Sequence, residues 1–293
     1  MNKFEELFAQ YNVKFSDEQV KSDVQGILSA HAAENNNIEV WKQCLSQIDL
    51  TTLSGDDTDV KVRRMAECVN NFVAQYPGLP NVASICVYPA MVPVVKEFLR
   101  SEGVGITSVA GGFPASQTFL EVKVAEVALA VAEGATEIDI VLSQGKFLEG
   151  KYEECFEEIR EQKSSARNAH LKVILETGAL KTAENIAKAS VLAMAAGADF
   201  IKTSTGKISV SATPEASYVM CKMIREWHEK TGEIVGFKPA GGVSTTDEAV
   251  AHYTIVKEVL GKEWLTNTRF RFGASRLANN ILSSIKGEDV KYF

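Results

Sequence analysis

Short runs of apolar and β-branched residues recur along the chain, and they alternate with longer stretches in which apolar residues are spaced three or four apart. Eight runs have the length of a strand. Several are almost wholly apolar, which is typical of strands buried on both faces of a parallel sheet. The eight predicted strands are Gln47–Leu50, Ala83–Val87, Ile106–Val109, Glu137–Leu142, Lys172–Leu175, Asp199–Lys202, Ile234–Lys238 and Phe270–Phe272.

The stretches between these runs have a helical pattern. In Val122–Ala132 the apolar residues fall on one face of a helix. Helix starts are indicated at Thr182 and at Thr213, where a capping hydroxyl precedes the apolar pattern and, in the second case, Pro214 occupies the first turn. The first 43 residues contain no strand pattern and are predicted to be helical, with one start near Ser16.

The spacing of the strands selects one fold. Their starts recur roughly every 30 residues, about the length of one βα unit. Eight strands, each followed by a helix, predict a single (β/α)₈ TIM barrel of the α/β class, because doubly wound sheets usually stop at about five or six strands. No linker rich in proline, glycine or serine divides the chain. We therefore expect residues 44–293 to form the barrel, with a short C-terminal tail, and residues 1–43 to form an N-terminal helical extension.

Composition places the chain among ordinary globular proteins. Of its 293 residues, 45% are hydrophobic and 24% are charged, and the formal net charge is −7. Disordered, collagen-like and coiled-coil classes are excluded by this composition. The acidic balance argues against binding to nucleic acid or to an anionic membrane, because both attract basic surfaces. It does not exclude a local positive pocket for a small anion.

The N-terminal residues and the cysteines indicate where in the cell the protein is located. The chain begins Met1-Asn2-Lys3-Phe4-Glu5-Glu6, with acidic residues where a signal peptide has basic ones. No stretch approaches the roughly 20 apolar residues that span a bilayer. The cysteines are an odd number without a C-x-x-C pair, which indicates neither a disulfide framework nor a zinc site; they are Cys44, Cys68, Cys86, Cys155 and Cys221. We therefore expect a cytoplasmic protein without a metal centre.

Two lysines stand where an apolar residue is expected. Lys202 and Lys238 each end a buried strand, and the two strands are neighbours in the predicted barrel. Active sites of such barrels lie at the C-terminal ends of the strands. Burial and a cationic neighbour both disfavour the charged amine, so one lysine can be uncharged near pH 7 and attack a carbonyl to form a Schiff base. Asp139, within the apolar fourth strand, is a candidate acid–base partner.

A purely structural alternative remains open for these residues. Lys202 and Lys238 can pair with Asp139 or Glu176 in a buried ion network that has no catalytic role. For a single lysine this alternative is favoured. Two strand-end lysines and an inward aspartate in one barrel favour the catalytic interpretation, because burying two amines side by side is costly without a use.

Loops that contain glycine follow the last three predicted strands. Gly241-Gly242 follows the seventh strand, Gly273-Ala274-Ser275 follows the eighth, and Thr205-Gly206-Lys207 follows the sixth. The loops after strands seven and eight often bind phosphate in barrels, where backbone N–H groups and a helix N-terminus face the anion. A glycine pair alone can equally be a tight turn, so the prediction depends on the loops occurring together.

The quoted residues resemble the signature stretches of deoxyribose-phosphate aldolases, a class I aldolase family. The resemblance extends from about residue 45 to 285 and preserves the family's order of motifs. The matching stretches are Ile48–Leu53, Ser84–Pro89, Glu137–Asp139, Val173–Gly178, Phe200–Lys207, Gly236–Val243 and Arg271–Ser275.

The resemblance implies a reaction and a role for each residue. The family reversibly cleaves 2-deoxy-D-ribose 5-phosphate to D-glyceraldehyde 3-phosphate and acetaldehyde, in deoxyribonucleoside catabolism and without a metal or organic cofactor. By motif, Lys202 is the Schiff-base nucleophile, Lys238 the neighbour that lowers its pKa, and Asp139 the proton-transfer group, working with a water. The implied phosphate and substrate ligands are Thr205, Gly206, Lys207, Gly241, Gly242, Gly273 and Ser275, and Cys86 is expected in the pocket wall.

The chain departs from the family pattern at two places. Arg276 follows Ser275 where some members have a second serine, so it either contacts the phosphate or points outward. Members often end in a tyrosine that assists proton transfer, whereas Tyr292 is penultimate here. We expect the four histidines, His31, His170, His228 and His252, to be solvated.

Two other functions are compatible with parts of this pattern. A transaldolase-like enzyme would share the lysine imine but bind a different acceptor, and a catalytically silent phosphosugar-binding protein would retain only the barrel. The two lysines and Asp139 argue against the silent alternative. The expected partner is a small phosphosugar, with no nucleic acid and no membrane, and a homo-oligomer is expected, with a dimer favoured.

Overall fold

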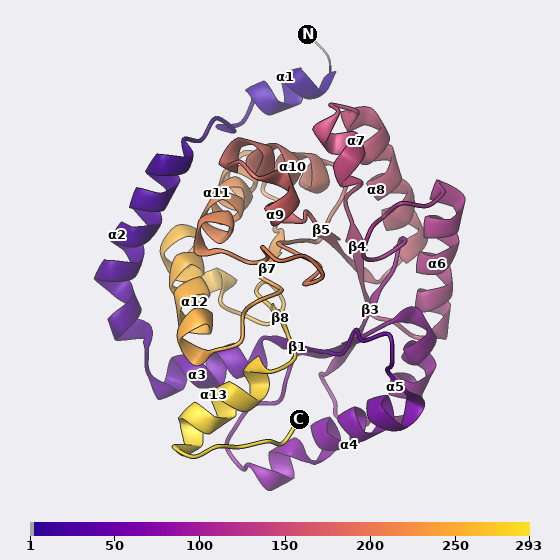
Figure 1. Cartoon of the computed structure of the whole chain (residues 1–293), viewed down its shortest axis with the longest axis vertical. Helices are drawn as coiled ribbons and strands as arrows, with labels where there is room; N and C mark the ends of the chain where they lie inside the picture. The colour runs from indigo at the N-terminus through magenta and orange to yellow at the C-terminus, as the bar shows by residue number, and fades with distance from the viewer. Residues whose placement is uncertain (1–2) are drawn as a thin grey trace.

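Eight parallel strands form a barrel at the centre of the molecule in the computed structural model, which describes residues 3–293 (Figure 1). Met1 and Asn2, which belong to the expected extension, lie outside the described residues. The sheet order is β7-β6-β5-β4-β3-β2-β1-β8, and the bridges Phe237–Phe270 and Ala240–Gly273 join β7 to β8. The strands are β1 Ile48–Thr51, β2 Ser84–Val87, β3 Gly105–Val109, β4 Glu137–Val141, β5 His170–Ile174, β6 Phe200–Lys202, β7 Gly236–Lys238 and β8 Phe272–Ala274.

The predicted fold class is confirmed, and all eight predicted runs overlap a strand. The largest shift is at the last strand, which is predicted at Phe270–Phe272 and observed at Phe272–Ala274. Phe270 still contacts the barrel, since it forms the isolated bridge to Phe237. The seventh strand begins two residues later than predicted because Ile234 is 48% exposed and lies outside the sheet.

Helices surround the barrel and cover the outer faces of the strands (Figure 1). Three starts predicted from the sequence are capped as expected, because the hydroxyls of Ser16, Thr182 and Thr213 each accept a hydrogen bond from a first-turn N–H. The helices are α1 Lys3–Ala9, α2 Asp17–Asn35, α3 Ile38–Ser46, α4 Asp59–Gln75, α5 Val92–Phe98, α6 Leu120–Glu133, α7 Gln144–Leu148, α8 Tyr152–Ala166, α9 Thr177–Leu180, α10 Ala183–Ala195, α11 Pro214–Thr231, α12 Thr246–Leu260 and α13 Leu277–Lys286, with 3₁₀ turns at Pro89–Met91 and Lys262–Trp264.

The N-terminal helices lie along the outside of the barrel helices. Helix α2 packs against α11 and α12, and α1 reaches α10 (Figure 1). The hydroxyl of Tyr218 in α11 donates to Asp23 in α2 at 3.0 Å, and the Tyr11 ring stacks on Trp227. The boundary expected at residue 43 falls inside α3, which leads directly into β1. Within the described residues, no helix is both long enough and apolar enough to cross a membrane.

Candidate active site

A cavity of about 490 Å³ opens at the C-terminal ends of the strands. Because all the strands of a parallel barrel end on the same side, loops that are far apart in the sequence meet there. The loops after β1, β6, β7 and β8 form its walls, with one residue contributed by α4. The lining residues are Thr51, Thr52, Leu53, Ser54, Lys61, Lys202, Thr205, Gly206, Lys207, Ala240, Gly241, Gly242, Val243, Ser244, Gly273, Ala274, Ser275 and Arg276.

Lys202 and Lys238 are brought together by the register of β6 and β7, in which they are direct partners. Both side chains are buried, and both Nζ atoms donate to the same oxygen, Oδ2 of Asp139, at 2.7 Å. Of these three residues, Lys202 alone lines the cavity. The arrangement therefore presents one amine to a bound molecule and holds a carboxylate and a second amine behind it.

A layer of buried charges lies against this trio. Lys172 on β5 contacts the other oxygen of Asp139 at 3.0 Å and Glu137 at 2.5 Å. Asp49 on β1 contacts Lys238 at 2.5 Å, and Arg271, just before β8, contacts both Asp49 and Glu137. Sequence reasoning gave these four residues no role, although Lys172, Glu137 and Asp49 are charged residues inside nearly apolar strands, a signal that could have found these three.

The pKa values of Lys202 and Lys238 are shifted in opposite directions. Burial lowers the pKa of Lys202 and the charge of Lys238 lowers it further, which outweighs the attraction of Asp139. Burial also acts to lower the pKa of Lys238, but Asp139 and Asp49 together raise it. Burial acts to raise the pKa of Asp139, yet Lys172, Lys202 and Lys238 hold it well below the usual range. Lys202 is therefore the amine most readily uncharged, beside an ionised carboxylate.

The glycine loops form part of the cavity wall. Gly206, Gly241 and Gly242 adopt φ values of +75°, +80° and +83°, a region that other residues rarely enter. A Cβ on Gly241 would lie 2.9 Å from the Cα of Gly206, so these two loops need glycine to approach each other. Ser275 follows β8 in the same wall. Backbone N–H groups in such loops can bind a phosphate.

The N-terminus of α13 is part of this wall. Arg276 occupies its N-cap position, and no side chain caps the first turn. Uncapped N–H groups at a helix N-terminus favour an anion. Arg276 lines the cavity itself, and so does Lys61 from α4, a cation that sequence reasoning missed. The Nζ of Lys207 donates to the carbonyl oxygen of Leu53, which ties the loop after β6 to the loop after β1.

Cys86 lies beside the buried trio but does not line the cavity, and Tyr292 lies away from the site. Cys86 is fully buried at the end of β2, and the cavity is lined without it, so it lies behind the wall instead of in it. Burial raises the pKa of its thiol. Tyr292 donates its hydroxyl to the carbonyl oxygen of Cys68 at 2.8 Å and packs edge-on against Phe72 and Tyr76, outside the cavity.

The prediction that all four histidines are solvated is wrong for His252. This residue is only 3% exposed and its ring pairs with the Ser217 hydroxyl at 2.8 Å. Burial lowers its pKa to about 4. It lies in α12, whose buried face contacts α11 and α2, which makes it a core residue.

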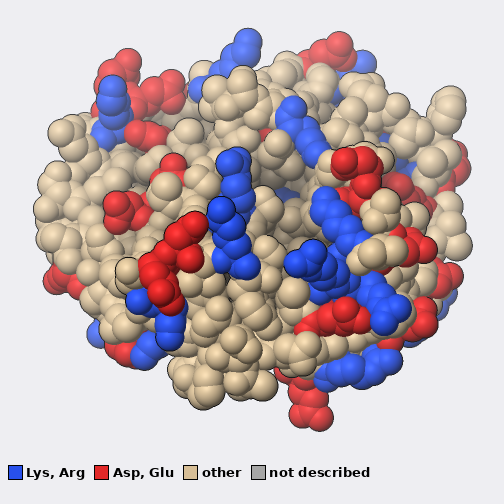
Figure 2. Space-filling view, turned by 60° about the horizontal axis from the view of Figure 1, so that its bottom comes forward, with Lys and Arg blue, Asp and Glu red and all other residues tan. Residues whose placement is uncertain are grey.

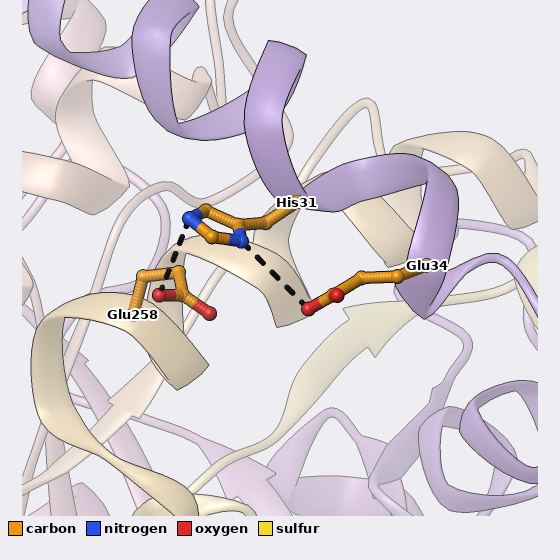
Figure 3. A group of neighbouring side chains, drawn as sticks. All are labelled: His31, Glu34 and Glu258. Atoms are coloured by element: carbon orange, nitrogen blue, oxygen red, sulfur yellow. Dashed lines mark ion pairs between the residues drawn. The ribbon is translucent and has the colours of Figure 1, made fainter.

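One group of side chains in the described part of the chain has the spacing of metal ligands, and it lies away from the cavity. The ligand atoms of His31, Glu34 and Glu258 all fall within 4.8 Å of one another. Figure 3 shows the imidazole between the two carboxylates, each 3.7 Å from a different ring nitrogen. Glu34 also pairs with Lys257 at 3.1 Å. We therefore interpret the group as a surface ion pair network between α2 and α12.

Charges of both signs cover the outer surface, so the net charge of −7 is not gathered on one side of the view in Figure 2. Lysine and arginine side chains gather about the middle of that face, with acidic side chains on either side. The cavity differs from this mixed outer surface. Its charged lining residues are Lys61, Lys202, Lys207 and Arg276, and no aspartate or glutamate lines it. A small anion is therefore its favoured occupant.

Comparisons with known proteins agree with this geometry. A Caenorhabditis elegans protein is 50% identical over 268 residues, which cover 90% of this chain and 88% of its own. The human deoxyribose-phosphate aldolase is 45% identical over 249 residues, or 80% of this chain and 77% of its own. The solved deoxyribose phosphate aldolase of Aeropyrum pernix, described as a unique tetramer, has a TM-score of 0.65 at 25% identity over 90% of this chain and 96% of its own. Residues 44–261 match the family described as DeoC/LacD family aldolase, and the chain belongs to that family of aldolases.

Proposed function

We propose that this aldolase acts on 2-deoxy-D-ribose 5-phosphate, which it cleaves reversibly to D-glyceraldehyde 3-phosphate and acetaldehyde, with Lys202 as the nucleophile. The observation that carries the proposal is the placement of Lys202. Its amine is the one in the buried trio that lines a cavity whose other charged groups are cations. The names of the relatives supply the substrate.

The first step forms the imine. The uncharged Nζ of Lys202 attacks the C1 aldehyde of the open-chain sugar, and the carbinolamine loses water to give a protonated imine. Asp139 lies 2.7 Å from this nitrogen and is ionised, so it can accept a proton and return it as the nitrogen changes its charge. Lys238 stays an ammonium and disfavours a second positive charge next to it.

The second step cleaves the C2–C3 bond. The C3 hydroxyl loses its proton through a bound water to Asp139, and the electron pair of the C2–C3 bond moves into the imine to give an enamine. Glyceraldehyde 3-phosphate, formed from C3 to C5, leaves first. Protonation of the enamine at C2 and hydrolysis of the resulting imine release acetaldehyde and restore the Lys202 amine. The imine is the electron sink for this cleavage.

The phosphate is assigned to the wall that the glycine loops form. The N–H groups around Gly206, Gly241, Gly242 and Gly273, together with the Ser275 hydroxyl, are placed to bind it, with Thr205 and Lys207 beside them. The Thr205 hydroxyl already donates a hydrogen bond to the Glu176 carboxylate at 2.5 Å, so it supports the loop more directly than it binds substrate. Holding the phosphate at this wall fixes C1 near Lys202.

Assembly and location are further parts of the proposal. We propose that the chain forms a homo-oligomer, with a dimer favoured, and acts in the cytoplasm. Size-exclusion chromatography with light scattering tests the first statement, and imaging of the tagged full chain tests the second.

A substrate comparison tests the reaction. Purified protein is incubated with deoxyribose 5-phosphate, and acetaldehyde is measured through a coupled reduction. We expect acetaldehyde release from the wild type and none from Lys202→Met. Transfer of a three-carbon dihydroxyacetone unit between sugar phosphates, without acetaldehyde release, would support the transaldolase-like alternative. Binding of sugar phosphates without turnover of either kind would support the silent binding protein.

A further inference from the structure

Arg271 is a buried arginine outside the catalytic trio, at the end of the barrel core farthest from the cavity. It precedes β8 and is 7% exposed. Its guanidinium contacts Glu137 through both Nη atoms, at 3.2 and 2.9 Å, and Asp49 through Nη1 at 2.5 Å. Its Nε donates to the carbonyl oxygen of Asn267. The two Nη atoms are therefore held against two carboxylates, and the Nε against a backbone carbonyl oxygen.

Two chains of ion pairs connect Arg271 to the nucleophile. The first passes through Asp49 and Lys238 to Asp139, and the second through Glu137 and Lys172 to the same aspartate. Asp139 is the residue that contacts Lys202. Arg271 therefore acts on Lys202 only through these intermediates.

A count of formal charges distinguishes Lys202 from the other cations. The network contains three carboxylates, on Asp49, Glu137 and Asp139, and four basic groups, on Lys172, Lys202, Lys238 and Arg271. Three of the basic groups balance the three carboxylates. A proton on the fourth leaves a net positive charge in a buried site, which is costly.

Among the described residues, no other carboxylate forms an ion pair with a member of this network. Cys86 on β2 is a thiol whose pKa burial raises, and β3 contributes Thr107, whose hydroxyl donates to Glu137 at 3.2 Å. Glu176, after β5, is held by the N–H and hydroxyl of Thr205. The pKa directions agree with the count, because the values for Lys172, Lys238 and Arg271 are raised and the value for Lys202 is lowered.

We propose that Arg271 is a positioning residue for the reaction: by balancing Asp49 and Glu137 at the base of the network, it leaves Lys202 as the one basic group without a carboxylate charge to match, and so keeps the nucleophile uncharged. The proposal rests on the proposed function, in which Lys202 forms the imine. In this account a residue before the N-terminal end of β8 controls the protonation of an amine at the C-terminal end of β6.

The test compares pH profiles of adduct formation at Lys202 in variants that change the charge count in opposite directions. Purified protein is treated with acetaldehyde and cyanoborohydride, and the rate of mass addition at Lys202 is followed from pH 5 to 9 for Arg271→Gln, Glu137→Gln and the double variant. Arg271→Gln leaves one carboxylate unbalanced, so its profile is expected to move to higher pH by about one unit. Glu137→Gln removes a carboxylate and is expected to move the profile to lower pH.

The double variant separates charge from packing. Arg271→Gln with Glu137→Gln restores the balance and is expected to bring the profile back near that of the wild type, although it has lost more contacts than either single variant. Arg271→Lys keeps the charge without the fork and is expected to leave the profile nearly unmoved. If Arg271→Gln does not fold, the pH profiles of Glu137→Gln and Arg271→Lys test the charge count in its place.

The outcomes are distinguishable from a failure of the proposed function. An absence of adduct at Lys202 in the wild type overturns the proposed function and this inference with it. If the wild type forms the adduct, three results overturn the role of Arg271 alone. They are a pH profile of Glu137→Gln that does not move, a profile of Arg271→Gln that does not move, and a profile of Arg271→Lys that shifts as far as that of Arg271→Gln.

Discussion

Lys202 and Lys238 are direct partners in the register of neighbouring strands, and their pKa values move in opposite directions. Two amines in such proximity cannot both remain charged at low cost in a buried site. Lys238 has a second carboxylate, Asp49, at 2.5 Å, whereas among the described residues Lys202 pairs with Asp139 alone. This unequal sharing of carboxylates, which the strand positions impose, is the reason why we propose Lys202 and not Lys238 as the nucleophile.

Removing the second amine should make Lys202 harder to deprotonate. In Lys238→Met the like charge is gone and Asp139 remains, so the pKa of Lys202 rises and less uncharged amine is present at neutral pH. We expect kcat at pH 7 to fall at least about tenfold and the acidic limb of the pH–rate profile to move to higher pH. Steady-state kinetics from pH 5 to 9 measure both. Lys188→Met, on the outer helix α10, is the matched control. An unmoved acidic limb would show that Lys238 does not set the pKa.

Removing the carboxylate should separate imine formation from turnover. Asp139→Asn takes away the charge that attracts a proton to Lys202, so the amine stays uncharged and the imine still forms. The proton transfers lose their acceptor, and we expect turnover to fall about 10² to 10⁴-fold. Mass spectrometry after borohydride reduction measures the imine, and acetaldehyde release measures turnover. Equal losses of both would contradict the role given to Asp139. Because buried amines lose a partner, the melting temperature should also fall.

The proposed phosphate site predicts a difference between two substrates. Ser275→Ala and Arg276→Gln should each lower kcat/KM for deoxyribose 5-phosphate more than for unphosphorylated deoxyribose, since only the former places an anion against the wall. A hydrogen bond to a charged group is worth about 1.5 to 3 kcal/mol, or roughly a tenfold loss or more. Competition assays with both sugars measure the ratio. Equal losses for the two sugars would remove the varied residue from the phosphate site.

The C-terminal tail gives a stability prediction. Tyr292→Phe removes the hydrogen bond to Cys68 while keeping the ring among Phe72 and Tyr76, so we expect a loss of about 1 kcal/mol in the free energy of unfolding. Because the hydroxyl lies outside the cavity, kcat should stay within about twofold. Denaturant titration and initial-rate assays measure the two. A large fall in kcat with unchanged stability would mean that the tail leaves α4 during turnover.

Much of the site could be predicted from the sequence because its parts stand at strand ends. Lys202 and Lys238 are each a charge that ends an apolar run, and the glycine loops follow directly, so the barrel topology alone brings them together. Arg271 and Lys61 could not be found in this way. Arg271 meets Glu137 across the barrel, between residues 134 positions apart, and Lys61 reaches the cavity from a helix. Such contacts depend on side-chain reach and not on the periodicity of the chain. The sequence did not indicate that His252 is buried. Helix α12 packs against both α2 and α11, and a polar residue on such a helix cannot be told from an exposed one by its spacing in the sequence.

Mass spectrometry of the protein reduced with borohydride in the presence of deoxyribose 5-phosphate tests the central assignment most directly. We expect one covalent adduct per chain, on the peptide that contains Lys202, and its loss in Lys202→Met while Lys238→Met still forms it at high pH. An adduct on Lys238 or elsewhere that persists in Lys202→Met, or no adduct in an enzyme that releases acetaldehyde, would contradict the assignment of Lys202 as the nucleophile.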